Sequence, residues 1–456
     1  MSAPPQTPPY IPKANEIEPI IDRIISEYVG YRDILARNIL PETATFDKVV
    51  QGLLELSDQI QGDLAVISCL GYASPDKATR DAVYKAQSRF SVVVGDMLAR
   101  DDLFSLIKAV NENAESLNPE HKKLARELLR DYTSAGHGTL SKTLIDDFKD
   151  RRDQIDELRR TFNENLRSEN GGLWFSNDQL EGLSEDQIAD FTKGTEPLHF
   201  GKTFVSFKRS DYNALMTYAD HPTTREAMYL ANEQKLTQNV PLFSKVVKLR
   251  DINAHLLGYK SHAAFRLERR MAQSPERVEQ FLTSLREGLA LLAKNEVEQL
   301  HARKRAHIAA NASNKELGSS SDFFPWDFHY YTRLFEQDHN VQHEKLAEYF
   351  PLQYTVAAML RLFAACLGLT FIQMPTEDLS DRIWHADVTV YSVWECASGN
   401  DGVHSGATTF IGYLYLDLLW REGKYRGNQN VNLQRVRSLK FHNPDDDALF
   451  DPLTPY

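Results

Sequence analysis

The sequence has few cysteines and no recognisable export signal, and these two absences argue against a secreted, disulfide-linked protein. Three cysteines in 456 residues, Cys69, Cys366 and Cys396, are widely scattered and show no CxxC spacing. We therefore expect no disulfide framework and a reducing, cytoplasmic location. The first twelve residues hold five prolines but neither a basic start nor an apolar core, so they do not resemble a signal peptide.

Long hydrophobic runs and an excess of positive charge are also missing. The most apolar stretch, residues 354–374, is interrupted by Arg361 and followed by Pro375. It predicts a buried helix that continues into a strand rather than a membrane span. Lys and Arg total 52 against 64 Asp and Glu, a net charge of −12. Such a balance argues against nucleic acid as a partner, because nucleic-acid binding needs a concentrated basic face.

Several catalytic motifs are absent as well. The Gly-Lys-Thr at 201–203 has Glu196 where a phosphate-binding loop needs glycine, and no GxSxG serine turn occurs. HExxH, the zinc motif of many peptidases, is nowhere in the 456 residues. His339 and His343 are one helical turn apart, but Asn340 stands where a zincin has its Glu base. We therefore expect two surface histidines and no metal ligands.

What the sequence does contain is mostly helical periodicity, in a chain long enough for two domains. A densely charged stretch with one apolar stripe predicts a long helix that begins after Ser141. Helical patterns resume near His221 and run to residue 310. The basic run at 301–307 is interpreted as a solvated helix face. We expect three segments: a disordered Pro-rich tail (1–15), an N-terminal helical domain (16–220) and a second domain (221–456).

Strand character is confined to two regions. Short strands are expected between Gly171 and Phe207, and clearer ones within 370–374, 386–396 and 407–420. In residues 412–419 leucines alternate with tyrosines and Asp417, which predicts a strand with one apolar and one mixed face. Such a strand is expected to have a partner on each side, and without cover it would expose an edge and an apolar patch.

Several stretches resemble the thimet-type zinc oligopeptidases, the M3 metallopeptidases. Residues 250–282 are similar to the family's segment containing Leu-Leu-Gly-Tyr, and residues 325–335 to its Trp-Asp-x-x-Tyr-Tyr segment. Residues 346–371, 383–393 and 412–427 match its Glu-Tyr-Phe-Pro, Trp-His and Arg-Glu-Gly-Lys segments. Residues 128–140 and 162–166 also fit the family's N-terminal half. The matches follow the family's order from about residue 100 to Gly427.

The resemblance implies a mainly α-helical, two-lobed thimet-oligopeptidase-like fold with a small C-terminal β-sheet. In that family the strand ending in Arg-Glu-Gly-Lys forms one wall of a narrow channel that admits short peptides. The zinc-binding HExxH helix follows that strand, and its Glu is the general base for zinc-activated water. This sequence stops before those residues, so the fold is expected to be incomplete. We expect no zinc bound catalytically, no catalytic residues and no hydrolysis by the 456 residues alone.

The family's channel provides the candidate substrate contacts in this chain, which are Trp384, His385, Tyr415, Arg421, Glu422 and Lys424. A structural role competes with this interpretation, since His385 is also suited to capping a strand and Arg421 to pairing with Glu422 in the turn.

Three interpretations of the whole chain stay open from the sequence. It is part of a longer oligopeptidase, a non-enzymatic remnant that binds short peptides, or half of a split enzyme completed by a second chain. The mass of the native protein, compared with the 52.1 kDa of this sequence, separates the first from the others.

Overall fold

The computed structural model describes residues 4–114, 117–311, 322–339, 343–396, 408–425 and 427–434. They form two compact units: unit 1 comprises Met1–Lys149 with Leu352–Tyr456, and unit 2 comprises Asp150–Pro351. Both units are mainly helical, and each contains a small antiparallel sheet. This confirms the predicted fold class, a mainly α-helical chain with a small C-terminal sheet.

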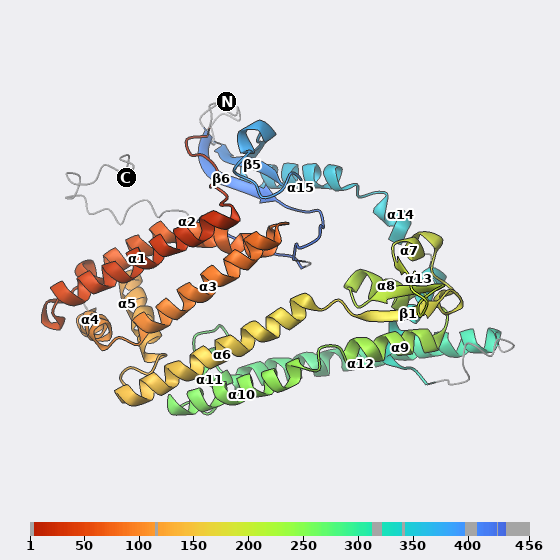
Figure 1. The fold of residues 1–456 in the computed structure, drawn as a ribbon, viewed down its shortest axis with the longest axis horizontal. Helices are drawn as coiled ribbons and strands as arrows, with labels where there is room; N and C mark the ends of the chain where they lie inside the picture. The colour runs from red at the N-terminus through yellow and green to blue at the C-terminus, as the bar shows by residue number, and fades with distance from the viewer. Residues whose placement is uncertain are drawn as a thin grey trace. The chain divides into compact units, whose positions relative to one another are not determined.

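The N-terminal helices of unit 1 enclose two hydrophobic clusters. Helices α1, α2 and α3 lie side by side, as Figure 1 shows in red and orange. Ile17, Ile21 and Ile24 recur at helical spacing and are buried between these helices. The Asp76 carboxylate accepts hydrogen bonds from the first backbone N–H groups of α3 and so fixes where that helix begins. The helices are α1 (Ala14–Asn38), a π-helix (Phe46–Gln51), α2 (Gly52–Ala73), α3 (Lys77–Leu98), α4 (Asp101–Glu112) and α5 (Pro119–Thr133).

The C-terminal part of unit 1 consists of a helix followed by a sheet. Helix α15 (Leu352–Leu367) leads directly into β4 (Leu369–Gln373), and β5 (Thr389–Cys396) and β6 (Thr408–Leu416) follow. The sheet order is β4-β5-β6, antiparallel throughout, with Val390 opposite Tyr415 and Ser392 opposite Tyr413. Within the described chain β6 pairs with β5 only, so it is an edge strand and lacks the second partner that the sequence led us to expect.

The residues just before α1 lie against this sheet. The Ile11 backbone N–H donates to the Asp381 carbonyl (3.0 Å), and Arg382 Nη1 donates to the Pro8 carbonyl (3.0 Å). The Tyr413 hydroxyl donates to the Gln6 carbonyl, and Ile11 is buried. Residues 6–13 thus have partners in the distant C-terminal segment, and α1 begins at Ala14. The disordered tail expected over residues 1–15 stays a prediction.

Unit 2 is built around a smaller sheet and several helices. Strand β3 is central, with β1 and β2 on either side of it, which confirms the strands expected between Gly171 and Phe207. Helix α6 begins at Lys142, directly after Ser141 as predicted, and enters unit 2 at Asp150. The elements are α6 (Lys142–Ser168), β1 (Gly172–Ser176), α7 (Glu185–Ala189), β2 (Thr192–Lys193), β3 (Lys202–Ser206), α8 (Arg209–Tyr218), α9 (Pro222–Glu233), α10 (Asn239–Leu256), α11 (His262–Leu267), α12 (Pro275–Ala310), α13 (Phe328–Asp338) and α14 (His343–Ala347).

A buried ionic centre lies within unit 2. Arg225 and Asp327 have fully buried side chains, and Arg225 Nη2 donates to Asp327 Oδ1 at 3.0 Å. Lys304 Nζ donates to Asp327 Oδ2 at 2.8 Å, and Arg225 Nη1 also donates to the Ala219 carbonyl at 2.7 Å. One carboxylate thus receives two cations. This corrects the interpretation of the basic run 301–307 as a solvated face, because Lys304 points into the unit to meet an acid from a later segment.

Helix α15 corrects another expectation. The sequence predicted that residues 354–374 form a buried helix running into a strand, and the helix-to-strand order is confirmed. Within the described helix, however, Leu360 is buried while most large side chains are exposed, among them Tyr354, Leu362, Phe363 and Leu367. Cys366 is exposed too. The apolar content of a sequence does not by itself decide whether a helix is buried, because burial needs another segment to cover it. Within the described chain no segment covers these faces of α15.

The two compact units divide the chain at Lys149/Asp150 and at Pro351/Leu352. Unit 1 is discontinuous because the segment after Leu352 returns to the N-terminal helices. The predicted boundary at residue 220 is a different division, based on sequence character, and it stays a prediction.

Candidate functional site

The six residues proposed from the sequence all lie in unit 1, around the end of β6. Trp384 and His385 precede β5, Tyr415 is in β6, and Arg421, Glu422 and Lys424 are in the turn that follows β6. Three of the six share one partner that the sequence did not single out, the carboxylate of Asp417.

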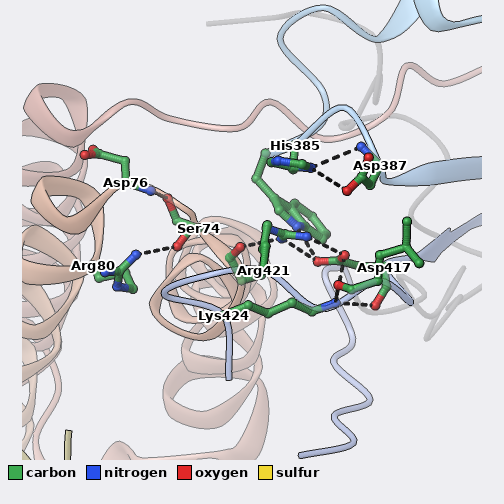
Figure 2. A network of polar contacts seen from close by, with 11 residues as sticks. Ser74, Asp76, Arg80, His385, Asp387, Asp417, Arg421 and Lys424 are labelled. Atoms are coloured by element: carbon green, nitrogen blue, oxygen red, sulfur yellow. Dashed lines mark hydrogen bonds and ion pairs between the residues drawn. The ribbon is translucent and has the colours of Figure 1, made fainter. Parts of the chain in front are cut away.

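Asp417 is the centre of a hydrogen-bonded network, shown in Figure 2. Arg421 binds it with two nitrogens, Nη1 to Oδ1 and Nη2 to Oδ2, each at 2.7 Å. Lys424 Nζ donates to Oδ1 at 2.9 Å and to the Asp417 carbonyl at 2.7 Å. Trp384 Nε1 donates to Oδ2 at 2.9 Å. Paired, charge-assisted bonds of this kind are the strongest that side chains make, so the turn after β6 has one well-defined arrangement.

The network is largely withdrawn from water. The side chains of Arg421, Asp417 and Lys424 are 9%, 11% and 15% exposed. Burial by itself raises the pKa of Asp417, but hydrogen bonds from Arg421, Lys424 and Trp384 outweigh it and lower that pKa to about 2. Burial, with a smaller contribution from the Asp417 charge, raises the pKa of the Cys69 thiol to about 12. Asp417 is therefore an anion at neutral pH and Cys69 a neutral thiol, which excludes Cys69 as a nucleophile.

The turn after β6 also completes the C-terminus of helix α2. A helix leaves its last carbonyls without partners, and here Arg421 Nη2 donates to the Ala73 carbonyl (2.6 Å) and the Tyr425 N–H to the Tyr72 carbonyl (2.7 Å). Arg80 Nη1 donates to the next carbonyl, that of Ser74, at 2.7 Å. Two guanidinium groups therefore lie at the negative end of the helix dipole, where cations are stabilising.

Gly423 allows the turn to approach this closely. Its φ is +81°, in the left-handed region, and a Cβ built there would lie 2.3 Å from Arg80 Nη1. Any other residue would be strained and would displace the Arg80 guanidinium. Close packing against Arg80 therefore explains why a glycine stands between Glu422 and Lys424.

Trp384 and Tyr415 form a second contact beside the network. Their rings are stacked with centroids 5.6 Å apart, and the Tyr415 hydroxyl donates to the Arg382 carbonyl at 3.2 Å. Burial is the main reason that the pKa of Tyr415 is raised, so its phenol is neutral. Both rings contact the small hydrophobic cluster of Leu379, Val388 and Val390. Two of the proposed substrate contacts thus have structural partners.

His385 and Glu422 differ from the other four residues. The His385 ring is partly exposed, and its Nδ1 accepts a hydrogen bond from the Asp387 N–H at 3.2 Å. Glu422 is exposed and has no hydrogen bond or ion pair within the described chain, so the alternative pairing with Arg421 is not formed. Contact with substrate stays a prediction for all six residues, and these two have the most freedom to make it.

The described residues do not fit a zinc ion. No three His, Cys, Asp or Glu side chains among them lie close enough together to hold a metal. His339 lies just beyond α13, its ring against the Phe335 carbonyl at 2.7 Å, while His343 begins α14. The two residues therefore do not belong to one helix.

Comparison with known proteins places this site in a family. The model of peptidase family M3 matches residues 215–449, just over half of the chain, and this span includes the Asp417 network and the buried Asp327. The chain belongs to peptidase family M3. Membership accounts for the order of motifs along the sequence, from the Trp-Asp segment at 326–327 to the Arg-Glu-Gly-Lys turn.

The curated relatives that match include several proteins named oligopeptidases. Saccharolysin of Saccharomyces cerevisiae is 27% identical over 444 residues, which are 94% of this chain and 59% of saccharolysin. Oligopeptidase A of Escherichia coli is 23% identical over 438 residues, 92% of this chain and 58% of the relative. Oligopeptidase PhomG of Diaporthe leptostromiformis is 27% identical over 391 residues, covering 83% and 52%. The chain thus spans about half the length of the curated relatives it matches.

In the described part of this M3 chain, no helix combines the length and the apolar character that crossing a bilayer requires.

Proposed function

We propose that this chain is an M3-family metalloendopeptidase chain whose parent activity is zinc-dependent hydrolysis of short peptides, and that its 456 residues supply peptide-binding and framework residues without hydrolysing peptides themselves. The observation that carries the proposal is the family match over residues 215–449 in a sequence without HExxH. The proposal includes the cytoplasmic location expected from cysteine use and charge.

The chemistry follows from what the residues present are able to do. Peptide hydrolysis by zinc needs a metal-bound water and a base to take its proton. The Asp417 carboxylate is not that base, because its pKa of about 2 and its three donors make it a poor proton acceptor. Asp417 instead fixes the position of the turn that contains Glu422 and Lys424.

The first prediction concerns hydrolysis. The purified 456-residue chain, incubated with zinc and a quenched fluorescent peptide of about ten residues, is expected to give no turnover above buffer. Chelator-sensitive cleavage by the pure chain would contradict the proposal. Saccharolysin assayed in parallel is the positive control for the peptide.

Restored turnover, rather than peptide binding, separates the proposal from its closest alternative. A non-enzymatic peptide-binding protein and a peptidase portion both bind the short peptide, but only a peptidase portion is expected to gain turnover when the zinc-binding part of an M3 relative is added. The comparisons offer no support for a natural second chain that supplies this part.

A further inference from the structure

The middle of helix α12 in unit 2 is exposed on every side. The helix is one uninterrupted run of 36 residues, Pro275–Ala310 (Figure 1). Near its C-terminus Leu300 is buried against Tyr330 and Tyr331 of α13. By contrast, every side chain from residue 279 to residue 299 is exposed. A surface helix ordinarily buries one apolar face, so this segment has a face that the described chain leaves uncovered.

The apolar side chains of this segment form a stripe with the spacing of a coiled coil. At successive intervals of four, three, four and three residues stand Val278, Leu282, Leu285, Leu289 and Leu292, here called the α12 stripe. This spacing keeps side chains in line along one side of a helix and is the pattern by which two helices pack together. Its four leucines are 46% to 55% exposed. Single exposed leucines are normal, but a continuous stripe marks an interaction surface.

The α12 stripe complements itself when a second copy of the helix runs in the opposite direction. With Val278 opposite Leu289 of the second copy and Leu282 opposite its Leu285, four apolar layers meet. The two-fold axis of this pair passes between Leu282 and Leu285, so every contact occurs twice. The next position of the repeat is Glu296, which ends the stripe.

Charges beside the stripe favour the antiparallel direction. Glu279 and Arg286 each follow a stripe residue directly, so they lie on the same side of the stripe. Antiparallel helices bring these equivalent sides together, and Glu279 of each copy then comes next to Arg286 of the other. Neither side chain has an ion pair within the described residues. In a parallel pair opposite sides of the stripe meet, and these two charges would stay apart.

The other side of the stripe is complementary in shape. Phe281 and Gly288 each come directly before a stripe residue, so the antiparallel pair places Phe281 of one copy beside Gly288 of the other. Phe281 is 66% exposed, and a Cβ built on Gly288 would have no atom within 4 Å. Glycine is unfavourable inside a helix, but its missing side chain leaves room for the ring of a second helix.

We propose that the α12 stripe binds a second copy of this chain, as an antiparallel helix pair with two-fold symmetry. The match of Glu279 with Arg286 and of Phe281 with Gly288 identifies a second copy as the occupant, because both matches join the helix to itself. Four layers form a small interface, so we expect a dissociation constant on the order of 10 μM. The pairing does not require a bound peptide and is independent of the proposed function.

Sedimentation equilibrium of the full 456-residue chain, from about 1 to 100 μM, measures the pairing. The average mass is expected to rise from the 52.1 kDa of one chain toward twice that value. Leu285→Lys, beside the two-fold axis, is expected to weaken pairing about 50-fold or more, because each dimer loses two buried leucines. Leu285 is 46% exposed in the single chain, so its replacement leaves folding intact.

Leu291→Lys is the matched control for this change. Leu291 is an exposed leucine of the same helix that lies off the stripe. The same replacement there is expected to leave the dissociation constant unchanged.

A charge exchange tests the direction of the helices. Arg286→Glu is expected to weaken pairing roughly five-fold, because each Glu279 then faces a second carboxylate. Adding Glu279→Arg in the same chain is expected to restore the wild-type constant, since the exchanged charges pair again. A parallel pair would respond to neither change in this way.

Three outcomes overturn the proposal. A mass that stays at 52.1 kDa up to about 100 μM leaves the stripe to another partner, such as the part of the M3 relatives that this chain does not match. Equal weakening by Leu285→Lys and Leu291→Lys places the association elsewhere. No restoration in the double variant excludes the antiparallel pair. None of these outcomes bears on the peptide assays of the proposed function.

Discussion

A single carboxylate organises the residues around the end of β6. The family resemblance predicted that Trp384, Arg421 and Lys424 contact substrate, and it did not single out the acid that joins them. The period-two alternation assigned Asp417 to the mixed face of a strand, although β6 ends at Leu416. The spacing of four residues to Arg421 was visible, yet outside a helix it does not imply contact. The bond from Trp384, 33 residues away, could not be read from one sequence.

Asp417→Asn is expected to destabilise the chain by about 3 kcal/mol, because it leaves Arg421 and Lys424 buried without their counter-charge. Urea unfolding followed by tryptophan fluorescence measures the change. Asp378→Asn, an exposed acid of the same unit, is the matched control and is expected to change stability by under about 0.5 kcal/mol. Equal stability of the two variants would contradict the central role of Asp417.

The depressed pKa of Asp417 predicts a dependence on acid. Its folded value is about 2, against 3.8 for the free group, so folding favours the deprotonated form. The stabilisation, about 2 kcal/mol, is therefore present above pH 4 to 5 and is lost as pH falls toward 2. The difference in unfolding free energy between wild type and Asp417→Asn is expected to shrink over that window. A difference that stays constant to pH 2.5 would count against the assigned cause.

At the scale of the elements, periodicity predicted the existence and the order of the helices well. It predicted less well which of their side chains are buried. The helix beginning after Ser141 is where the sequence placed it. The apolar α15 is exposed and the basic run around Lys304 is partly buried, because burial depends on a partner that is distant in sequence. Lys304 meets an acid 23 residues later, and the faces of α15 meet no described segment.

The end of α2 gives a prediction for a whole element. Gly423→Ala is expected to destabilise by about 1 to 2 kcal/mol, because the left-handed φ strains alanine and its Cβ displaces Arg80 from the α2 carbonyls. Gly30→Ala is the control, since that glycine lies inside α1 with open space around it and alanine favours helix there. Thermal unfolding separates the two, with the control expected to be neutral or stabilised.

Over the whole molecule, the two units hold separate ionic centres, Asp417 in unit 1 and Asp327 in unit 2. The family motifs found in the sequence include the segments around both acids. The discontinuity of unit 1 had no signal in the sequence, because it depends on long-range contacts such as that of Arg421 with the Ala73 carbonyl.

Asp327→Asn is expected to raise amide hydrogen exchange within residues 209–338, since it leaves Arg225 and Lys304 buried without their counter-charge. Asp417→Asn is expected to raise exchange at residues 52–80 and 408–425. The double variant should show the two patterns added, because the two networks share no residue. Faster exchange in unit 2 caused by Asp417→Asn alone would contradict this.

The capping of α2 by Arg421 has a consequence during synthesis. The Ala73 carbonyl and the guanidinium that binds it are 348 residues apart, so translation at about 5 to 20 residues per second separates their appearance by roughly 20 to 70 s. All of unit 2 is made within that interval. A nascent chain therefore holds its first helices while the C-terminal carbonyls of α2 are still bound by water and not by Arg421.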